Sequence, residues 1–268
     1  MTQKYLHGYD DVEQSRLTTQ NSILAKYIYD RCPFDYNQRI LEVGCGVGAQ
    51  MDYVLRNFSP SQLTGVDISV EQINQAKVNL VHHPNSQYDL IACSIEEYQP
   101  NLPYDALLMV WVLEHVPDPQ LLLNQSLSHL KRGATVFITE VNHKSMLIGG
   151  ASEKFYQLWN ASVDYQTNLG GDANIGQKLP QLFDNTGKLA DIDVSPYLMH
   201  FDQSQSLKRD ELLTYIIDLV QSAALPMIAD NYIEESLWLR VKEELASLVG
   251  QQDASFSYSF IQGRARVV

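Results

Sequence analysis

Basic residues are few in this sequence relative to acidic ones. Its 268 residues include 19 lysines and arginines against 32 aspartates and glutamates, a formal net charge of −13. A field of this sign repels nucleic-acid phosphates and anionic lipid surfaces, and the basic residues are scattered rather than clustered. We therefore expect no nucleic-acid partner and no membrane partner. The charge remains compatible with a small ligand in a shielded pocket.

Cysteines and long apolar runs are also scarce. Cys32, Cys45 and Cys93 are far apart, without metal-ligand spacing, which favours a reducing compartment over a disulfide framework. The longest apolar run, Ala106–Leu113, is too short to span a bilayer. Met1–Asp10 has no apolar signal core. We expect a soluble, cytoplasmic protein that is a monomer or a homodimer.

The first half of the chain alternates short apolar strands with amphipathic helices. The segment 104–112 is nearly all apolar, as in a strand covered on both faces. The alternation predicts an α/β fold, a parallel sheet with helices on both faces. The expected strands are 39–43, 62–66, 88–92, 104–112 and 134–140, and the expected helices are 11–29, 49–57, 70–80 and 119–130.

The pattern changes after residue 140. Helical stretches are predicted over 143–167, 175–183 and 207–250, the last interrupted at Pro226, with strands at 190–201 and 255–261. We interpret two helical stretches as insertions that cap the sheet. The expected parts are an N-terminal helical lid (1–30), a cofactor-binding core (31–142), a helical insertion (143–173), a continuation of the core (174–202), a helical cap (203–250) and a final core strand (251–268).

A glycine-rich turn, Gly44-Cys45-Gly46-Val47-Gly48-Ala49, lies between a predicted strand and a predicted helix. Glycines there let the backbone approach a ligand closely. Asp67 follows about twenty residues later, where a carboxylate would accept ribose hydroxyls. Taken alone, the turn fits either a nicotinamide dinucleotide or S-adenosylmethionine (SAM).

Three further features favour SAM. Glu42 lies late in the first strand, where an apolar residue would pack better. The third strand is followed by Cys93-Ser94-Ile95-Glu96, which offers a polar group and an apolar face for an adenine. The fourth strand continues into Trp111-Val112-Leu113-Glu114-His115-Val116-Pro117-Asp118.

Together these motifs resemble the class I SAM-dependent methyltransferases, particularly the branch that methylates quinones, lipids and secondary metabolites. The resemblance covers about Arg39–Glu140 and is specific in combination. It implies a Rossmann-like, doubly wound sheet of seven strands, mostly parallel, with an antiparallel last strand that Ser255–Ile261 would supply. It also implies SAM as cofactor, S-adenosylhomocysteine as product, and a small-molecule acceptor in a capped pocket.

We expect Glu42 and the glycine backbone to hold the methionine end of SAM, and Asp67 to hold both ribose hydroxyls. Ile68 would pack on adenine, with Ser94 and Ile95 at its edge. The residues expected to bind the cofactor are Tyr9, Arg16, Glu42, Gly44, Cys45, Gly46, Gly48, Asp67, Ile68, Ser94, Ile95, Val110 and Trp111.

A narrower resemblance involves two other runs. Tyr5-Leu6-His7-Gly8-Tyr9 and Gly170-Gly171-Asp172-Ala173-Asn174-Ile175-Gly176 are similar to motifs of a subgroup that includes toxoflavin-pathway and fungal secondary-metabolite methyltransferases. That subgroup often has arginine where this chain has Gln177. The resemblance implies that Tyr9 and Arg16 fold over the site, with Arg16 pairing with the SAM carboxylate. A solvated helix face is the alternative for Arg16.

His115 is the main candidate for a general base, because an imidazole can take a proton near pH 7. The alternative is that Glu114 and His115 shape the loop. Tyr9 is a second catalytic candidate. The expected substrate pocket comprises Tyr5, His115, Tyr156, Trp159 and Asp172, each of which could instead serve in loops, caps or core packing.

No metal site is expected. His82 and His83 are adjacent residues at a helix end, which we expect not to face one site, and no carboxylate follows them. We therefore interpret them as part of a solvated loop.

Three other functions compete with small-molecule methylation. They are a non-catalytic SAM-binding or partner-binding protein, an NAD-dependent oxidoreductase, and methylation of protein or RNA. The acidic balance disfavours the last, and no Asn/Asp-Pro-Pro-Tyr run follows the fourth strand.

Overall fold

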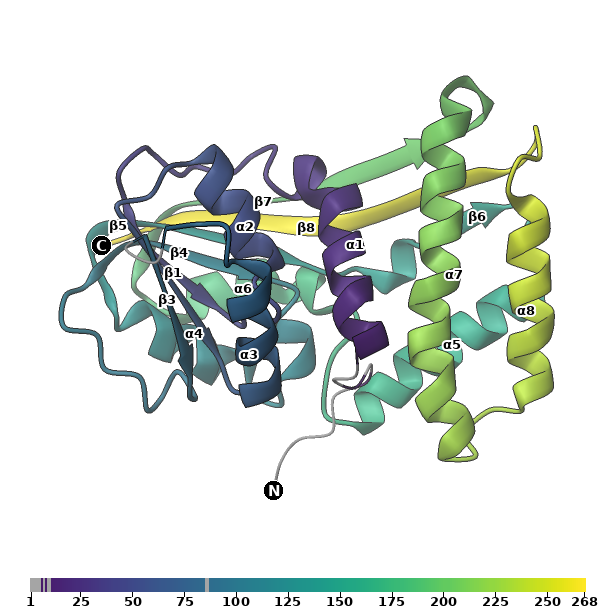
Figure 1. Ribbon diagram of the computed structural model, residues 1–268, viewed down its shortest axis with the longest axis horizontal. Helices are drawn as coiled ribbons and strands as arrows, with labels where there is room; N and C mark the ends of the chain where they lie inside the picture. Colours follow the sequence, from purple (N-terminus) through teal and green to yellow (C-terminus); the bar gives the residue numbers. More distant parts are fainter. Residues whose placement is uncertain (1–5, 7, 9–10, 85–86) are drawn as a thin grey trace.

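The computed structural model describes residues 6, 8, 11–84 and 87–268 (Figure 1). Within these residues the strands form one sheet of 8, in the order β3-β2-β1-β4-β5-β8-β6, with β7 also pairing with β8. The strands are β1 (Arg39–Val43), β2 (Gln62–Asp67), β3 (Tyr88–Ala92), β4 (Tyr104–Val110), β5 (Leu130–Glu140), β6 (Leu147–Gly149), β7 (Leu189–Phe201) and β8 (Ser255–Val267).

The five strands β3-β2-β1-β4-β5 are parallel, which confirms the predicted α/β fold. Side chains alternate between two hydrophobic cores, one on each face of the sheet. In β1, Ile40 joins one core while Leu41 and Val43 join the other. The first core also takes buried residues of α2 (Ala49–Asn57) and α3 (Val70–Asn79). The second takes residues of α4 (Pro119–Leu127) and α6 (Leu179–Asn185).

The predicted antiparallel last strand is present, but the predicted number of seven strands is wrong. β8 runs antiparallel to β5, β6 and β7 and is longer than expected, with 13 residues. Its first residues, Ser255–Ser257, extend beyond β5 and pair with β6. The segment 147–149, which we expected to be helical, is therefore a short strand, because it covers an edge of β8 that would otherwise have unpaired backbone groups.

Helices gather beside the extended ends of β7 and β8 (Figure 1). These are α5 (Glu153–Asn168), α7 (Ser206–Ala229) and α8 (Glu235–Leu248), and α1 (Asp11–Ile28) lies between them and the helices of the sheet. α7 packs against α1, α5 and α8. The predicted interruption of the helical stretch is present, but it comes at 230–234, between α7 and α8, and Pro226 itself lies in the last turn of α7.

The segment 203–229, which contains α7, is long and apolar enough to cross a membrane by length and composition alone. Its apolar residues include Leu212, Ile216 and Val220, which are buried in the first core. In the described part of the chain, the helix therefore uses much of its apolar surface for packing within the protein.

Candidate functional site

The glycine turn after β1 is built from three left-handed glycines, Gly44, Gly46 and Gly48, with φ of 72°, 51° and 75°. L-residues with side chains rarely adopt this conformation. At Gly44 a side chain is also excluded by contact, because a Cβ there would lie 2.6 Å from Cγ2 of Val112. The turn therefore presents bare backbone, which a ligand can approach closely.

Asp67, at the end of β2, is fixed by this turn. Gly46 N–H donates to Oδ2 of Asp67 and Ser69 N–H donates to Oδ1, both at 2.8 Å. Burial raises the pKa of the Asp67 carboxyl, although these backbone hydrogen bonds oppose the rise. Each carboxylate oxygen keeps further acceptor capacity. The next residue, Ile68, is 75% exposed. Asp67, Ile68 and the glycine turn line one cavity, so a fixed carboxylate lies beside an apolar surface.

Glu42 lies behind the turn rather than on the cavity wall. Its side chain is 1% exposed, and its Oε2 has no hydrogen-bond partner among the described residues. Burial, and then the negative charge of Asp67, raise the pKa of Glu42 well above its usual value. Leaving a buried carboxyl oxygen without a hydrogen-bond partner costs free energy. A polar or cationic ligand group bound near Gly44 would supply such a partner.

The segment after β4 is held in a strained turn. Trp111 has φ of 56°, uncommon for a residue with a side chain. The turn places Val112 against Gly44, and Oε1 of Glu140 accepts the N–H groups of Val112 (2.9 Å) and Leu113 (2.7 Å). Glu140, at the end of β5, thus fixes the loop that carries Glu114 and His115.

The Gly-Gly-Asp motif clamps the same loop. Asp172 N–H donates to the carbonyl oxygen of Glu114 at 2.8 Å, and Gln166 Nε2 donates to Oε2 of Glu114 at 2.9 Å. A Cβ on Gly171 would collide with the Glu114 carbonyl. The carboxylate of Asp172 pairs with Nζ of Lys178 at 2.6 Å. The structure thus corrects the prediction that Asp172 belongs to the substrate pocket, because its backbone docks the loop and its side chain faces Lys178.

A cavity of about 560 Å³ joins this region to the helices beside β7 and β8. Its volume is within the usual range for small-molecule sites. At the glycine end it is lined by Gly44, Cys45, Gly46, Asp67, Ile68, Ser94, Ile95, Val110 and Trp111. At the helical end it is lined by Arg16, Leu17, His115, His143, Met146, Trp159, Met199, Tyr215, Ile216, Phe256 and Tyr258.

Most residues predicted to bind the cofactor thus share one cavity. Glu42 and Gly48 shape the turn without lining that cavity. Tyr5 and Tyr9 lie outside the described residues. Of the two aromatic pocket candidates that lie within the described residues, Trp159 lines the cavity, whereas the hydroxyl of Tyr156 bonds the backbone of Ile148, so Tyr156 does not belong to the pocket.

Arg16 is buried, 7% exposed, so a solvated helix face is the wrong interpretation. Glu13 holds its guanidinium with two hydrogen bonds, of 2.7 Å from Nε and 2.6 Å from Nη2. Nη1 donates to Oε1 of Gln20 at 2.5 Å. Arg16 therefore reaches the cavity as part of an ion pair, with its charge largely offset by Glu13.

Two histidines, His115 and His143, are among the residues that line the helical end of the cavity. For His115, desolvation, helped by the nearby His143 and Arg16, lowers the pKa to about 3. Its Nδ1 lies 3.5 Å from Nε2 of Gln166, and its Nε2 lies 3.5 Å from Oε1 of Glu114. Both ring nitrogens of His115 thus face protein groups, which supports a part in shaping the loop.

Sequence reasoning missed His143. It follows the end of β5 by three residues, and desolvation lowers its pKa to about 4. Its Nδ1 lies 3.1 Å from the hydroxyl oxygen of Tyr258, and its ring packs 4.8 Å from that of Trp159. Its position at the carboxyl end of a parallel strand was a signal available in the sequence.

Glu114 gives a prediction for pH and stability. Burial, then the charge of Glu140, raise the pKa of Glu114 to about 8, whereas an unfolded glutamate has a pKa of about 4.3. Between these values the folded state binds a proton that the unfolded state has released, so the free energy of unfolding falls as pH rises. Urea melts from pH 6 to 9 should show this fall in the wild type and a weaker one in Glu114→Gln.

Glu140, with its pKa raised to about 7 by burial, leaves a residual fall of the same sign in that variant. The exposed Glu153 provides the control substitution Glu153→Gln, which should keep the wild-type slope. Equal slopes for Glu114→Gln and wild type would show the assignment to be wrong.

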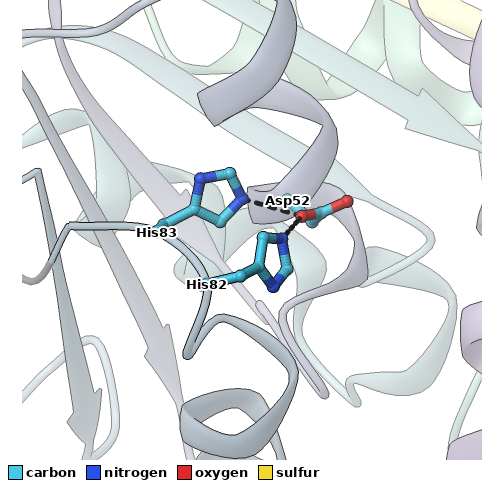
Figure 2. Close-up of side chains that lie close together, drawn as sticks. All are labelled: Asp52, His82 and His83. Atoms are coloured by element: carbon cyan, nitrogen blue, oxygen red, sulfur yellow. Dashed lines mark hydrogen bonds and ion pairs between the residues drawn. The ribbon is translucent and has the colours of Figure 1, made fainter.

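The prediction for His82 and His83 needs correction. Their Nε2 atoms lie 2.8 Å and 2.7 Å from the same oxygen, Oδ1 of Asp52 (Figure 2). The carboxylate comes from α2, an earlier element than the one that carries the histidines, so inspection of the following residues could not find it. The two adjacent histidines do face one site, because they lie in the turn after α3 and not within the helix.

Comparisons with known proteins agree with this architecture. Ubiquinone biosynthesis O-methyltransferase of Klebsiella pneumoniae is 30% identical over 124 residues, which cover 46% of this chain and 50% of that protein. The corresponding Xanthomonas campestris protein is 30% identical over 134 residues, covering 49% of this chain and 54% of that protein. The chain thus spans about half the length of the curated relatives it matches.

Among solved structures, Haemonchus contortus phosphoethanolamine N-methyltransferase 2 in complex with SAM has a TM-score of 0.58. It is 18% identical, and the match covers 99% of this chain and 58% of that chain. At this identity the likeness concerns the fold. A family model for a methyltransferase domain matches residues 19–187, more than half of the 268 residues. The chain therefore belongs to the methyltransferase domain family.

Proposed function

We propose that this protein transfers the methyl group of SAM to a small-molecule acceptor inside the cavity. The observation that carries the proposal is one continuous cavity, with a carboxylate and bare glycine backbone at one end and an apolar chamber at the other. Bound SAM supplies an electrophilic methyl on a sulfonium. The acceptor's lone pair forms the new bond to carbon as the carbon–sulfur bond breaks, its electrons go to sulfur, and the product is S-adenosylhomocysteine.

The residues at the glycine end fit SAM. Asp67 has acceptor capacity for two ribose hydroxyls, and exposed Ile68 offers a surface for adenine. Behind the glycine turn, the unpaired Oε2 of Glu42 provides a partner for the cofactor's ammonium through a bridging water. The match to a methyltransferase domain and the SAM complex of the Haemonchus enzyme support this choice.

The topology disfavours the NAD-dependent alternative. A dinucleotide-binding fold of the usual order 3-2-1-4-5-6 continues with a parallel strand after the fifth. Here the strand beside β5 is β8, which is antiparallel.

The covering helices disfavour protein or RNA methylation, since α1, α5 and α7 all contribute to the cavity wall. For the predicted division of the chain, we propose that the segments 1–30, 143–173 and 203–250 form the part of the protein that binds the acceptor.

The electrostatics of the chamber favour an uncharged acceptor. At pH 7, pKa values of about 3 and 4 keep His115 and His143 neutral, and a pKa of about 8 keeps Glu114 mostly protonated. Arg16 is paired with Glu13. These four side chains therefore present no uncompensated charge to the apolar chamber. An apolar molecule with a hydroxyl fits, in line with the O-methyltransferase names of the curated relatives.

We infer that His143, rather than His115, takes the proton of that hydroxyl. Its Nδ1 is turned to Tyr258, which leaves Nε2 for the acceptor when the proton is on Nδ1. Methyl transfer then places the hydroxyl proton on Nε2. His115 remains a candidate from sequence, and Tyr9 another, but His115 is engaged by Gln166 and Glu114.

The experiment is a transfer assay with methyl-labelled SAM and a matched panel of acceptors: hydroxylated aromatic rings with apolar chains, the same compounds with amines in place of hydroxyls, a protein mixture and RNA. We expect label on the hydroxylated compounds. Label confined to amines would refute the acceptor assignment. No transfer to any member, with SAM bound, would favour the non-catalytic SAM-binding alternative.

A further inference from the structure

Outside the cavity, three metal-ligating side chains converge between two helices (Figure 2). Asp52 comes from α2, and His82 and His83 come from the turn after α3. Their ligand atoms all lie within 4.8 Å of one another. The exposed fractions of the side chains are 28% for Asp52, 47% for His82 and 11% for His83. The cluster is thus anchored in the fold on one side and open to solvent on the other.

Hydrogen bonding alone does not satisfy this cluster. Nε2 of His82 lies 2.8 Å from Oδ1 of Asp52 and 2.9 Å from Nη2 of Arg56. If Nε2 of His82 carries a proton, that proton faces a guanidinium N–H, so two donors meet. If Nε2 carries no proton, its lone pair faces the carboxylate oxygen, so two acceptors meet. One of the two contacts is therefore unfavourable whichever tautomer is present.

A metal cation in place of Arg56 removes this conflict. With Nε2 unprotonated, each imidazole offers a lone pair, as does the Asp52 carboxylate. Arg56 is able to leave, because its side chain is 58% exposed and its other contact is to the same carboxylate. Solvent reaches the site at His82 and supplies water for the remaining coordination position.

We propose that Asp52, His82 and His83 bind a divalent transition-metal cation of the Zn²⁺ class. Two imidazoles with one carboxylate suit Zn²⁺, Co²⁺ or Ni²⁺ better than Mg²⁺ or Ca²⁺, which prefer all-oxygen ligands. The ligand atoms would separate slightly, since metal–ligand bonds of about 2.0–2.2 Å need wider spacing than hydrogen bonds do.

The bound cation would act structurally. None of the three ligands lines the cavity. However, α2 begins at the glycine turn, where Asp52 N–H donates to the carbonyl of Gly48 at 2.9 Å, and α3 begins three residues after Asp67. A metal that joins the first turn of α2 to the turn after the C-terminal end of α3 would therefore stabilise the two helices that follow β1 and β2 at the cofactor end of the cavity.

The test is a titration of the untagged 268-residue chain with Zn²⁺ alone, followed by calorimetry and by thermal melts. We expect saturable binding of one ion per chain, and a melting temperature raised by about 5–10 °C at a hundredfold excess over the Kd. Co²⁺ should give visible absorption bands from low-symmetry nitrogen and oxygen ligands. Absence of saturable binding would overturn the proposal.

Four variants assign the site. Asp52→Asn and the double variant His82→Ala/His83→Ala should weaken binding at least about tenfold, and both involve part-exposed side chains, so circular dichroism should show native folding. Arg56→Gln should tighten binding up to about fivefold, because it removes a competing cation. His200→Ala, which alters another exposed histidine beside a carboxylate, Asp202, should change nothing. Equal binding by the wild type and the double variant would place the metal elsewhere and refute the proposal.

Discussion

Replacing Gly44 with valine is expected to weaken SAM binding by at least about 100-fold, or about 2.7 kcal/mol. Gly44 has φ of 72°, and its Cβ would lie 2.6 Å from one methyl of Val112 and 2.8 Å from the other. The side chain must therefore displace either the glycine turn or the loop after β4, and both line the glycine end of the cavity, where we propose that SAM binds. Calorimetric titration with SAM measures the effect.

Gly133 provides a matched control. It also has a positive φ, 83°, but a Cβ there meets nothing within 4 Å. Gly133→Val therefore carries the backbone strain without the collision, and it should keep SAM binding near that of the wild type. A second test combines Gly44→Ala with Val112→Ala, which makes room and should restore part of the affinity. Wild-type affinity in Gly44→Val would contradict the assigned role of the turn.

Replacing His143 with alanine is expected to lower turnover by about 100-fold or more, the usual contribution of a general base. SAM affinity should stay within about threefold of the wild type, because His143 lies beyond the glycine end of the cavity. The residual rate should rise with pH, since ionisation of the acceptor hydroxyl then replaces proton removal by the enzyme. Steady-state kinetics over pH 6–10 with a hydroxylated acceptor provide the measurement.

His115→Ala and Tyr258→Phe distinguish this role from a structural one. Loss of Tyr258's hydroxyl removes the partner of Nδ1 and should reduce turnover less than loss of the imidazole. His115→Ala should reduce it by less than about tenfold. If His115→Ala loses 100-fold while His143→Ala does not, the base is His115, as the sequence alone favoured, and our assignment of His143 is wrong.

The arrangement of residues at the glycine end of the cavity was predictable from sequence because its parts are local. A strand, a glycine turn and a helix specify where Gly44 and Gly46 lie, and the carboxyl ends of neighbouring parallel strands bring Asp67 and Ser94 to the same edge. These relations follow from strand periodicity and order, which a single sequence reveals.

The helical end of the cavity was less predictable because its contacts are distant in sequence. Tyr258 reaches His143 only because β8 inserts beside β5, and the length of β8 beyond β5 had no sequence signal that we recognised. We predicted the role of the Gly-Gly-Asp motif from the side chain of Asp172. In the structure, Gly171 and the backbone of Asp172 contact the carbonyl of Glu114 instead.

The same holds for the histidine pair. His82 and His83 were visible in the sequence, but Asp52 lies on α2, some thirty residues earlier, and only helix packing joins them. Helical periodicity misled the interpretation, because the two histidines follow the end of α3 at Asn79. Adjacent side chains on a helix point in different directions, whereas adjacent side chains in a turn can point toward one site.

Comparative calorimetry tests most directly whether the cavity binds SAM through Asp67. SAM, S-adenosylhomocysteine and NADH are titrated into the wild type, Asp67→Ala and the control Asp89→Ala, which alters an exposed aspartate on β3. We predict saturable binding of SAM and S-adenosylhomocysteine, no binding of NADH, and about 100-fold weaker binding to Asp67→Ala alone, because two charge-assisted hydrogen bonds are lost. Binding of NADH in preference to SAM, or undiminished SAM binding by Asp67→Ala, would contradict the claim.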